Sequence, residues 1–196
     1  MAKQMEIRWH ARGGQGAKTA AVLLAEAASE AGKFIQGFPE YGPERMGAPI
    51  LAFNRISDEP IHVHCHVTEP EVVVVLDPTL IGKAGVTEGL PENGVILVNT
   101  SKSPAEIRKR LKLEKGRVMT VDASAIAMDT IGRDIPNTPM MGALLKATGL
   151  MPFAKFMALM RSNLEHKFKS KPAVIEGNLK AIERAYQEVR SDDDKS

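Results

Sequence analysis

Three uninterrupted apolar runs constrain the fold of this chain more than any other feature. EVVVVLD (71–77) and GVILVNT (94–100) are continuous and rich in β-branched residues, and RVMTVDA (117–123) is a weaker third copy. Strands that are apolar at every position are covered on both faces, as in a parallel sheet. Helical stretches are expected between the runs, at 79–85 and 103–113. The runs therefore predict a β-α-β-α-β order.

The N-terminal part continues this alternation and adds an antiparallel excursion. A first strand is predicted over 5–11 and a helix over 16–31, followed by strands over 33–38 and 49–57. IHVHCHV (61–67) alternates strictly, and the turn SDEP precedes it. This pattern predicts an antiparallel pair made by the strands 49–57 and 61–67.

After residue 122 only helices are expected, at 123–132, 139–149, 152–165 and 173–190. In NTPMMG, Thr138 is predicted as an N-cap with Pro139 at the first helical position. The prediction is a three-layer α/β/α fold with a largely parallel, Rossmann-like sheet, one antiparallel strand pair and C-terminal helices. Residues 1–190 are expected to form a single domain, and the charged tail 191–196 is expected to be disordered.

Composition excludes several classes of protein. A net charge of +2 gives no reason to expect nucleic acid or an anionic membrane as the main partner. The single cysteine rules out a disulfide framework and a cysteine-ligated iron–sulfur cluster within this chain. The longest apolar run, VVVVL at 72–76, is too short to span a bilayer, and no signal peptide is visible. We therefore expect a cytoplasmic protein.

The stretch HARGGQGAKT (10–19) lies between the first strand and the first helix, as an anion-binding loop does. It fits neither of the two commonest phosphate-binding patterns. The triphosphatase pattern requires glycine where Ala17 and Arg12 stand, and G-x-G-x-x-G would read Gly14, Gly16 and Thr19. The second strand also ends without the acidic residue that would hold a ribose. A phosphate site and a tight structural turn both remain open.

The stretch FPEYGPERMGAPI (38–50) is unusually rich in proline and glycine, which cannot continue a strand or a helix. It is predicted to be a loop at the end of the second strand, where α/β folds place their ligand crevice. It is either a surface loop packed by its own aromatic residues or a surface for a ligand or partner.

The predicted strand 61–67 carries His62, His64 and His66 on one face and Cys65 on the other. Histidines at i and i+2 are usable zinc ligands, but no acid or fourth ligand is evident nearby. We therefore predict no metal site and expect solvated or interfacial histidines. Cys65 is expected to be a buried core thiol. No G-x-S-x-G turn supports a hydrolase.

Taken together, EIRWHARGGQGAKTAA and FPEYGPERMGAP resemble the gamma subunit of 2-oxoacid:ferredoxin oxidoreductases, in particular the pyruvate type. VVVVLDPTL and NTPMMGALLKATG extend the resemblance over most of the chain. The resemblance implies an enzyme that decarboxylates a 2-oxoacid on thiamine diphosphate, reduces ferredoxin through iron–sulfur clusters and passes the acyl group to coenzyme A. Pyruvate is the expected substrate.

The resemblance also implies a division of labour among subunits. Thiamine diphosphate, Mg and the iron–sulfur clusters would lie on alpha, beta and delta-type partners, and coenzyme A would bind this chain, which would hold no catalytic residue. The glycine loop supplies the candidate binding residues Arg12, Gly13, Gly14, Gln15, Gly16, Lys18 and Thr19, with Tyr41, Glu44 and Arg45 as pocket or interface candidates. Arg12 and Lys18 could equally be solvated charges at the helix end. The alternatives are a stand-alone nucleotide-binding module and a structural docking subunit.

Overall fold

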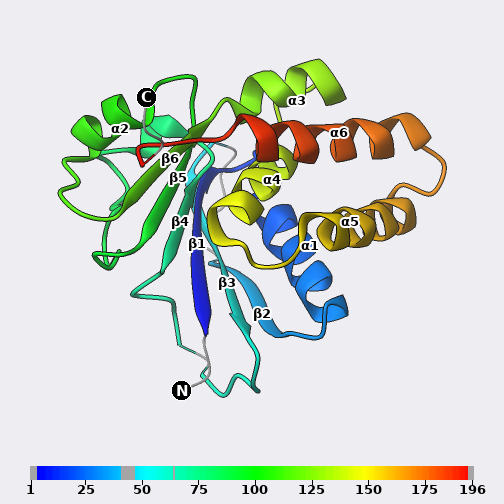
Figure 1. The fold of residues 1–196 in the computed structure, drawn as a ribbon, viewed down its shortest axis with the longest axis horizontal. Coiled ribbons are helices and arrows are strands. Elements are labelled where there is room, and N and C mark those ends of the chain that lie inside the picture. Colours follow the sequence, from blue (N-terminus) through cyan, green and yellow to red (C-terminus); the bar gives the residue numbers. More distant parts are fainter. Residues whose placement is uncertain (1–3, 41–46, 64, 194–196) are drawn as a thin grey trace.

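A computed structural model describes residues 4–40, 47–63 and 65–193. Within these ranges the chain forms one seven-stranded sheet, with the strand order β2-β3-β1-β4-β5-β6-β7 (Figure 1). The strands are β1 (Met5–Arg12), β2 (Phe34–Glu40), β3 (Pro49–Ser57), β4 (Val72–Val75), β5 (Val95–Asn99), β6 (Arg117–Val121) and β7 (Arg190–Ser191).

The centre of the sheet is parallel, as the continuous apolar runs predict. β1, β4, β5 and β6 pair in parallel, and every residue of β4 and β5 is buried. The antiparallel part lies at one edge, where β3 pairs with β1 on one side and with β2 on the other. β7 adds a short antiparallel pairing at the opposite edge.

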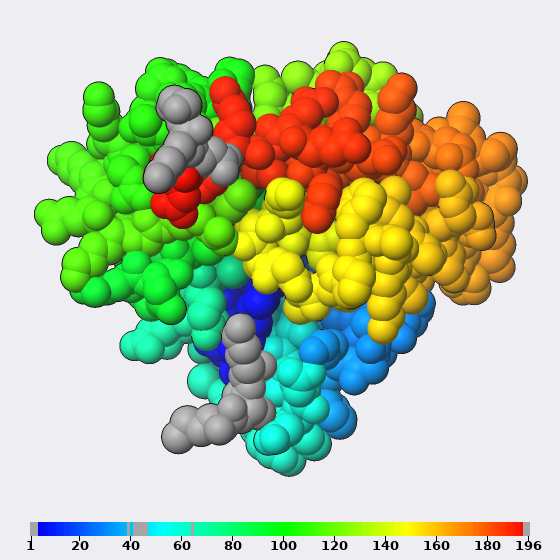
Figure 2. Space-filling model, viewed as in Figure 1, coloured from blue at the N-terminus to red at the C-terminus, as the bar shows by residue number. Residues whose placement is uncertain are grey.

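Helices cover both faces of the sheet, which confirms the predicted α/β/α layers (Figure 1). α1, α4, α5 and α6 lie on one face around the larger hydrophobic cluster, whereas α2 and the segment after β4 cover the other face. Residues of α4 to α6 make up much of the molecular surface in Figure 2. The helices are α1 (Ala17–Glu30), α2 (Pro104–Leu111), α3 (Ala123–Ile131), α4 (Asn137–Thr148), α5 (Phe153–Lys167) and α6 (Pro172–Glu188).

The helix expected over 79–85 is wrong. Only a 3-10 turn, η1 (Pro78–Leu80), forms there, with the Asp77 carboxylate accepting a hydrogen bond from the Thr79 amide at its start. Gly82 and Gly85 follow with φ angles of 80° and 55°. Such left-handed backbone ends a helical turn rather than extending it.

The strand predicted over 61–67 is also wrong, because its described residues form no ladder. The Arg55 guanidinium donates to the carbonyls of Val63 and Cys65 at 3.4 and 2.6 Å, which gives these groups a side-chain partner in place of a strand. Cys65 is exposed rather than buried in the core.

The proline-rich loop is shorter than predicted. β2 continues through Glu40 and β3 begins at Pro49, so both ends of the stretch 38–50 belong to strands. Proline is tolerated at position 39 because β2 is an edge strand. Tyr41, Glu44 and Arg45 lie outside the described residues.

Two expectations near the C-terminus also need correction. α4 begins at Asn137 after Pro136, so Thr138 lies in its first turn and is not the N-cap. The tail is ordered beyond residue 190, since Ser191 pairs with β6 and Asp192 accepts a hydrogen bond from the Val118 amide at 3.0 Å. Residues 194–196 lie outside the described ranges.

Candidate functional site

The glycine-rich loop lies at the carboxyl end of β1, where the strand order changes direction. From β1 the chain passes through α1 to β2 on one side of the sheet, whereas β4 leads to β5 on the other side. Open α/β sheets bind ligands beside such a switch point. The loop therefore occupies the position at which this fold is expected to hold a ligand.

A polar network joins the two strands at this switch point. Arg12 ends β1, and its Nε lies 3.0 Å from Oδ2 of Asp77, the second residue after β4. Arg12 also donates to Thr79 Oγ1 and to the Gly47 carbonyl, each at 3.0 Å. Gln15 accepts a hydrogen bond from the Arg12 amide at 2.8 Å and donates to Asp77 at 3.2 Å. Arg12 and Gln15 are thus held by the protein itself.

Asp77 is ionised in this network. Its burial alone would raise the pKa of the carboxyl group, but hydrogen bonds from Thr79 and Gln15 and the charge of Arg12 together lower it below its ordinary value. The carboxylate therefore balances the Arg12 guanidinium, which reduces the positive charge that Arg12 can offer to an anion.

Two glycines give the loop its shape. Gly14 and Gly16 have φ angles of 98° and 82°, a conformation that side chains other than glycine rarely adopt. A Cβ on Gly16 would lie only 2.6 Å from Nδ2 of Asn137, whose amide donates to the Gly16 carbonyl at 3.4 Å. The loop is therefore packed directly against the start of α4.

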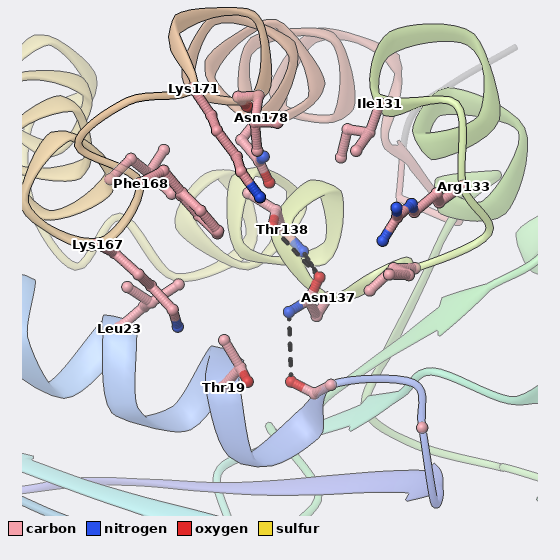
Figure 3. Close-up of a pocket in the computed structure, with 15 residues that line it drawn as sticks. Thr19, Leu23, Ile131, Arg133, Asn137, Thr138, Lys167, Phe168, Lys171 and Asn178 are labelled. Carbon is pink, nitrogen blue, oxygen red and sulfur yellow. Dashed lines mark hydrogen bonds between the residues drawn. The ribbon is translucent and has the colours of Figure 1, made fainter.

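A cavity of about 500 Å³ opens beside these glycines. The start of α1, the α3–α4 connection, the end of α5 and the start of α6 line it, and Figure 3 shows Arg133 and Lys171 reaching toward its centre. Arg133, Lys167 and Lys171 are its charged residues, and none of the described residues that line it carries a carboxylate. Its electrostatic character therefore suits an anion.

The helices that begin at this cavity lack capping side chains. α1, α4 and α6 have no side-chain hydrogen bond at the N-cap and no acidic residue in the first turn. In contrast, Ser103 caps α2 and Asp122 caps α3, although α5 also begins uncapped. All three starts present the positive end of a helix dipole, to which an anion can bind. Amide donors are fewer, because the Thr138 amide donates to Asn137 Oδ1 and because α6 begins with a proline.

The structure brings only some of the predicted binding residues to the cavity. Gly14, Gly16 and Thr19 line it, and Lys18 is exposed on the first turn of α1. The Gly13 amide donates to the Ala48 carbonyl at 3.0 Å, so this donor is already used within the protein.

Sequence reasoning did not identify Asp77, Asn137 or the three cations of the cavity. Asp77 could have been recognised from the sequence, because an acidic residue just after a buried parallel strand lies at the edge of the sheet where ligands bind. Arg133, Lys167 and Lys171 had none, since they lie at helix ends more than 110 residues from the loop along the chain.

No group of three or more His, Cys, Asp or Glu side chains in the described part of the chain could hold a metal ion. His62 and His66 are exposed, and His64 lies outside the described ranges. None of the helices formed by residues 4–40, 47–63 and 65–193 is long and apolar enough to cross a membrane.

Comparison with known proteins gives consistent results. Residues 6–188 match the family described as pyruvate ferredoxin/flavodoxin oxidoreductase. The chain is 50% identical to the pyruvate synthase subunit PorC of Thermotoga maritima, with 96% of each chain covered. It is 45% identical to the common gamma subunit of the pyruvate/ketoisovalerate oxidoreductases of Thermococcus kodakarensis, with 94% of this chain and 97% of the relative covered.

Solved structures agree with these relatives. A crystal structure of the pyruvate oxidoreductase subunit PORC from Thermotoga maritima superposes with a TM-score of 0.85 at 47% identity, covering 97% of this chain and 99% of that one. A 2-oxoglutarate:ferredoxin oxidoreductase from Magnetococcus marinus, solved with coenzyme A bound, contains the same fold with a TM-score of 0.74. Its 18% identity, over 94% of this chain and 31% of that one, shows the fold alone. The chain therefore belongs to the pyruvate ferredoxin/flavodoxin oxidoreductase family, as a member of its PorC or gamma type.

Proposed function

We propose that this chain is the coenzyme A-holding gamma subunit of a cytoplasmic 2-oxoacid:ferredoxin oxidoreductase. In the proposed reaction, pyruvate, coenzyme A and oxidised ferredoxin yield acetyl-coenzyme A, CO₂ and reduced ferredoxin. Alpha, beta and delta-type subunits would carry thiamine diphosphate, Mg and the iron–sulfur clusters. This chain has only one cysteine and cannot supply the ligands of a cluster.

The observation that carries the proposal is the basic cavity beside the glycine loop. Coenzyme A ends in an adenine nucleotide with a pyrophosphate and a further 3′-phosphate, so it brings several negative charges to one place. Arg133, Lys167 and Lys171 and the starts of α1, α4 and α6 would neutralise them. A volume of about 500 Å³ is within the range of cofactor-sized pockets.

The proposed role is positioning rather than chemistry. Gly14 and Gly16 let the backbone approach a phosphate closely, and both line the cavity. A nucleotide fixed there would leave the thiol end of coenzyme A free to reach an acyl intermediate on a partner subunit. Such a contribution accelerates a reaction through proximity and needs no acid, base or nucleophile from this chain.

The test is calorimetric titration of the purified chain with coenzyme A, dephospho-coenzyme A, NAD and ATP. We expect coenzyme A to bind best, and we expect Lys171→Ala to weaken its binding about tenfold because one charge-assisted contact is lost. Lys169→Ala is the matched control, since Lys169 is exposed on the same connection but does not line the cavity.

Tighter binding of NAD or ATP than of coenzyme A would contradict the proposal and favour a stand-alone nucleotide-binding module. Equal affinities of the Lys171→Ala and Lys169→Ala variants for coenzyme A would show that coenzyme A does not bind in this cavity. If no ligand binds the chain either alone or within its complex, a structural docking subunit becomes the better explanation.

A further inference from the structure

The helix α2 and the residues beside it concentrate the positive charge of the chain. Residues 102–117 contain seven lysine and arginine residues and two glutamates, a net charge of +5. The whole chain carries +2, so the remaining residues together carry −3. Four exposed cations of this segment form what we call the α2 surface, namely Lys102, Lys109, Arg110 and Lys112. Positive charge gathered in this way attracts a negatively charged partner.

The cations of the α2 surface are not neutralised by the chain itself. None of the four forms an ion pair with another residue of the described ranges. Their neighbours do, since Arg108 pairs with Asp192 at 2.6 Å and Lys115 pairs with Glu92. The segment therefore contains cations that stabilise the fold and, beside them, cations whose charge is available to a partner.

The backbone of Lys112 is strained. Its φ angle is 54°, and among the described residues it is the only one other than glycine with a left-handed φ. Lys112 is the C-cap of α2, a position that Gly132 and Gly149 occupy after α3 and α4. Glycine is favoured there because a Cβ raises the energy of left-handed backbone. A lysine kept in this conformation at an exposed turn indicates that its charge is used.

The composition of the α2 surface fits a protein that binds transiently. None of the large apolar side chains exposed in the described structure lies between residues 102 and 117. Permanent subunit interfaces have apolar centres, whereas charged surfaces promote fast association of partners that also separate again. The partner expected here is a soluble protein with a carboxylate-rich face.

The position of α2 leaves the ligand site accessible. α2 lies on the opposite face of the sheet from α1, α4, α5 and α6 (Figure 1). The starts of α1 and α6 line the basic cavity, so a protein bound to the α2 surface would not cover it. The proposed reaction requires one protein that arrives and leaves during turnover, the electron carrier.

We propose that the α2 surface docks the electron carrier of the reaction through a carboxylate-rich face of that carrier. This inference rests on the proposed function, in which ferredoxin accepts the electrons. Electrons would still leave from a cluster on a partner subunit, and the α2 surface would hold the carrier beside that cluster. The chain would thus have a second task, separate from holding coenzyme A.

The test compares two charge reversals in the assembled complex. Lys109→Glu alters the α2 surface. Lys180→Glu is the matched control, since Lys180 is an exposed lysine of α6, on the other face of the sheet. Initial rates are measured with ferredoxin and, separately, with methyl viologen, a small acceptor that needs no protein docking surface. Both series are run from low ionic strength to about 0.5 M salt.

We expect Lys109→Glu to raise the KM for ferredoxin about three- to tenfold at low ionic strength, with kcat unchanged, because a steering charge acts mainly on association. The difference should shrink at about 0.5 M salt, where the Debye length is below about 5 Å. Rates with methyl viologen should not change.

Equal KM values for ferredoxin in the Lys109→Glu and Lys180→Glu complexes would overturn the inference and leave the proposed function intact. A loss that is equally large with methyl viologen would also overturn it, because it would reflect a general structural effect. If the wild-type complex reduces methyl viologen but not ferredoxin, the proposed function fails as well.

Lys112→Gly provides an independent check. Glycine relieves the left-handed backbone, so the melting temperature of the chain should rise by about 2–4 °C. The lost charge should at the same time raise the KM of the complex for ferredoxin about two- to threefold. A more stable variant with an unchanged KM would show that the charge of Lys112 is not used and would contradict the inference.

Discussion

Polar residues are buried on both faces of β1, and their hydrogen-bond partners differ. On the α1 face, Trp9 Nε1 donates to Asn54 Oδ1 at 2.9 Å, and Asn54 in turn donates to the Ala21 carbonyl at 2.9 Å. On the opposite face, Arg8 is satisfied by His10 and by backbone carbonyls. His10 alone of these residues keeps a nitrogen without a partner in the described structure.

The buried neutral ring makes folding sensitive to pH. The pKa of His10 is about 3 in the folded chain and about 6.5 in an unfolded one. Between these values the unfolded state binds a proton that the folded state does not bind. The free energy of unfolding should therefore fall as the pH is lowered from about 6.5 toward 3, by at most about 1.4 kcal/mol per pH unit from this residue.

Urea unfolding of the wild type and of His10→Gln at a series of pH values between 7 and 4 checks this prediction. The two proteins share their other titrating groups, so the difference between their slopes belongs to His10. Parallel slopes would show that the ring is protonated as easily in the folded chain as in the unfolded one.

Sequence reasoning located the loop but not the residues around it. Strand, glycines and helix follow one another in HARGGQGAKT, so an anion site could be predicted from local order. The ion pair between Arg12 and Asp77 could not be predicted, because it depends on which strand lies beside β1. For the same reason nothing in the sequence distinguishes His10 from an ordinary strand residue.

At the level of elements, the junction of α1 with α4 fixes the loop. A Cβ on Gly16 would meet Asn137, which is 6% exposed and has little space to move, whereas a Cβ on Gly14 would meet nothing within 4 Å. Both glycines have positive φ angles. The pair thus separates backbone strain from steric crowding.

Gly14→Ala should destabilise the chain by about 1–2 kcal/mol, the cost of a left-handed alanine. Gly16→Ala should lose about 1–3 kcal/mol more, since Asn137 must also be displaced. Equilibrium denaturation of both variants measures the difference. An equal loss of unfolding free energy in the two variants would mean that Asn137 and α4 shift without cost and do not hold the loop.

Elements were predictable where the pattern had a single physical cause. The continuous valine run of β4 could only be a strand covered on both faces, and it is. The alternating run 61–67 was misread because alternation also arises in a segment whose carbonyls are bound by a side chain, here that of Arg55. Arg55 lies on β3, only eight to ten residues before these carbonyls, but the alternation of the run does not show that a side chain would bind them.

At the level of the whole molecule, the last described residues form one edge of the sheet. β7 pairs with β6, and Asp192 lies 2.6 Å from Arg108 of α2. The backbones of Asp192 and Val118 are also joined at 3.1 Å. The chain end thus ties one helical layer to the edge of the sheet.

Asp192→Ala should lower the free energy of unfolding by about 1–3 kcal/mol, because a partly buried ion pair and a hydrogen bond to the Val118 amide are lost. Asp193→Ala is the control, since Asp193 is exposed, and it should change stability little. Thermal or urea unfolding of the two variants gives the comparison. A neutral Asp192→Ala variant would show that the chain end is dispensable for the fold.

The ion pair of Arg12 and Asp77 also limits how deeply a ligand can enter the sheet between β1 and β4. The pair joins the end of β1 to the residues that follow β4, at the point where an open α/β sheet usually binds its ligand. A molecule held here must rest on the rim of the sheet rather than inside it, with one side turned outward. A site of this kind suits a substrate that reacts on a neighbouring protein and exchanges at every turnover. It suits a permanently bound prosthetic group less well.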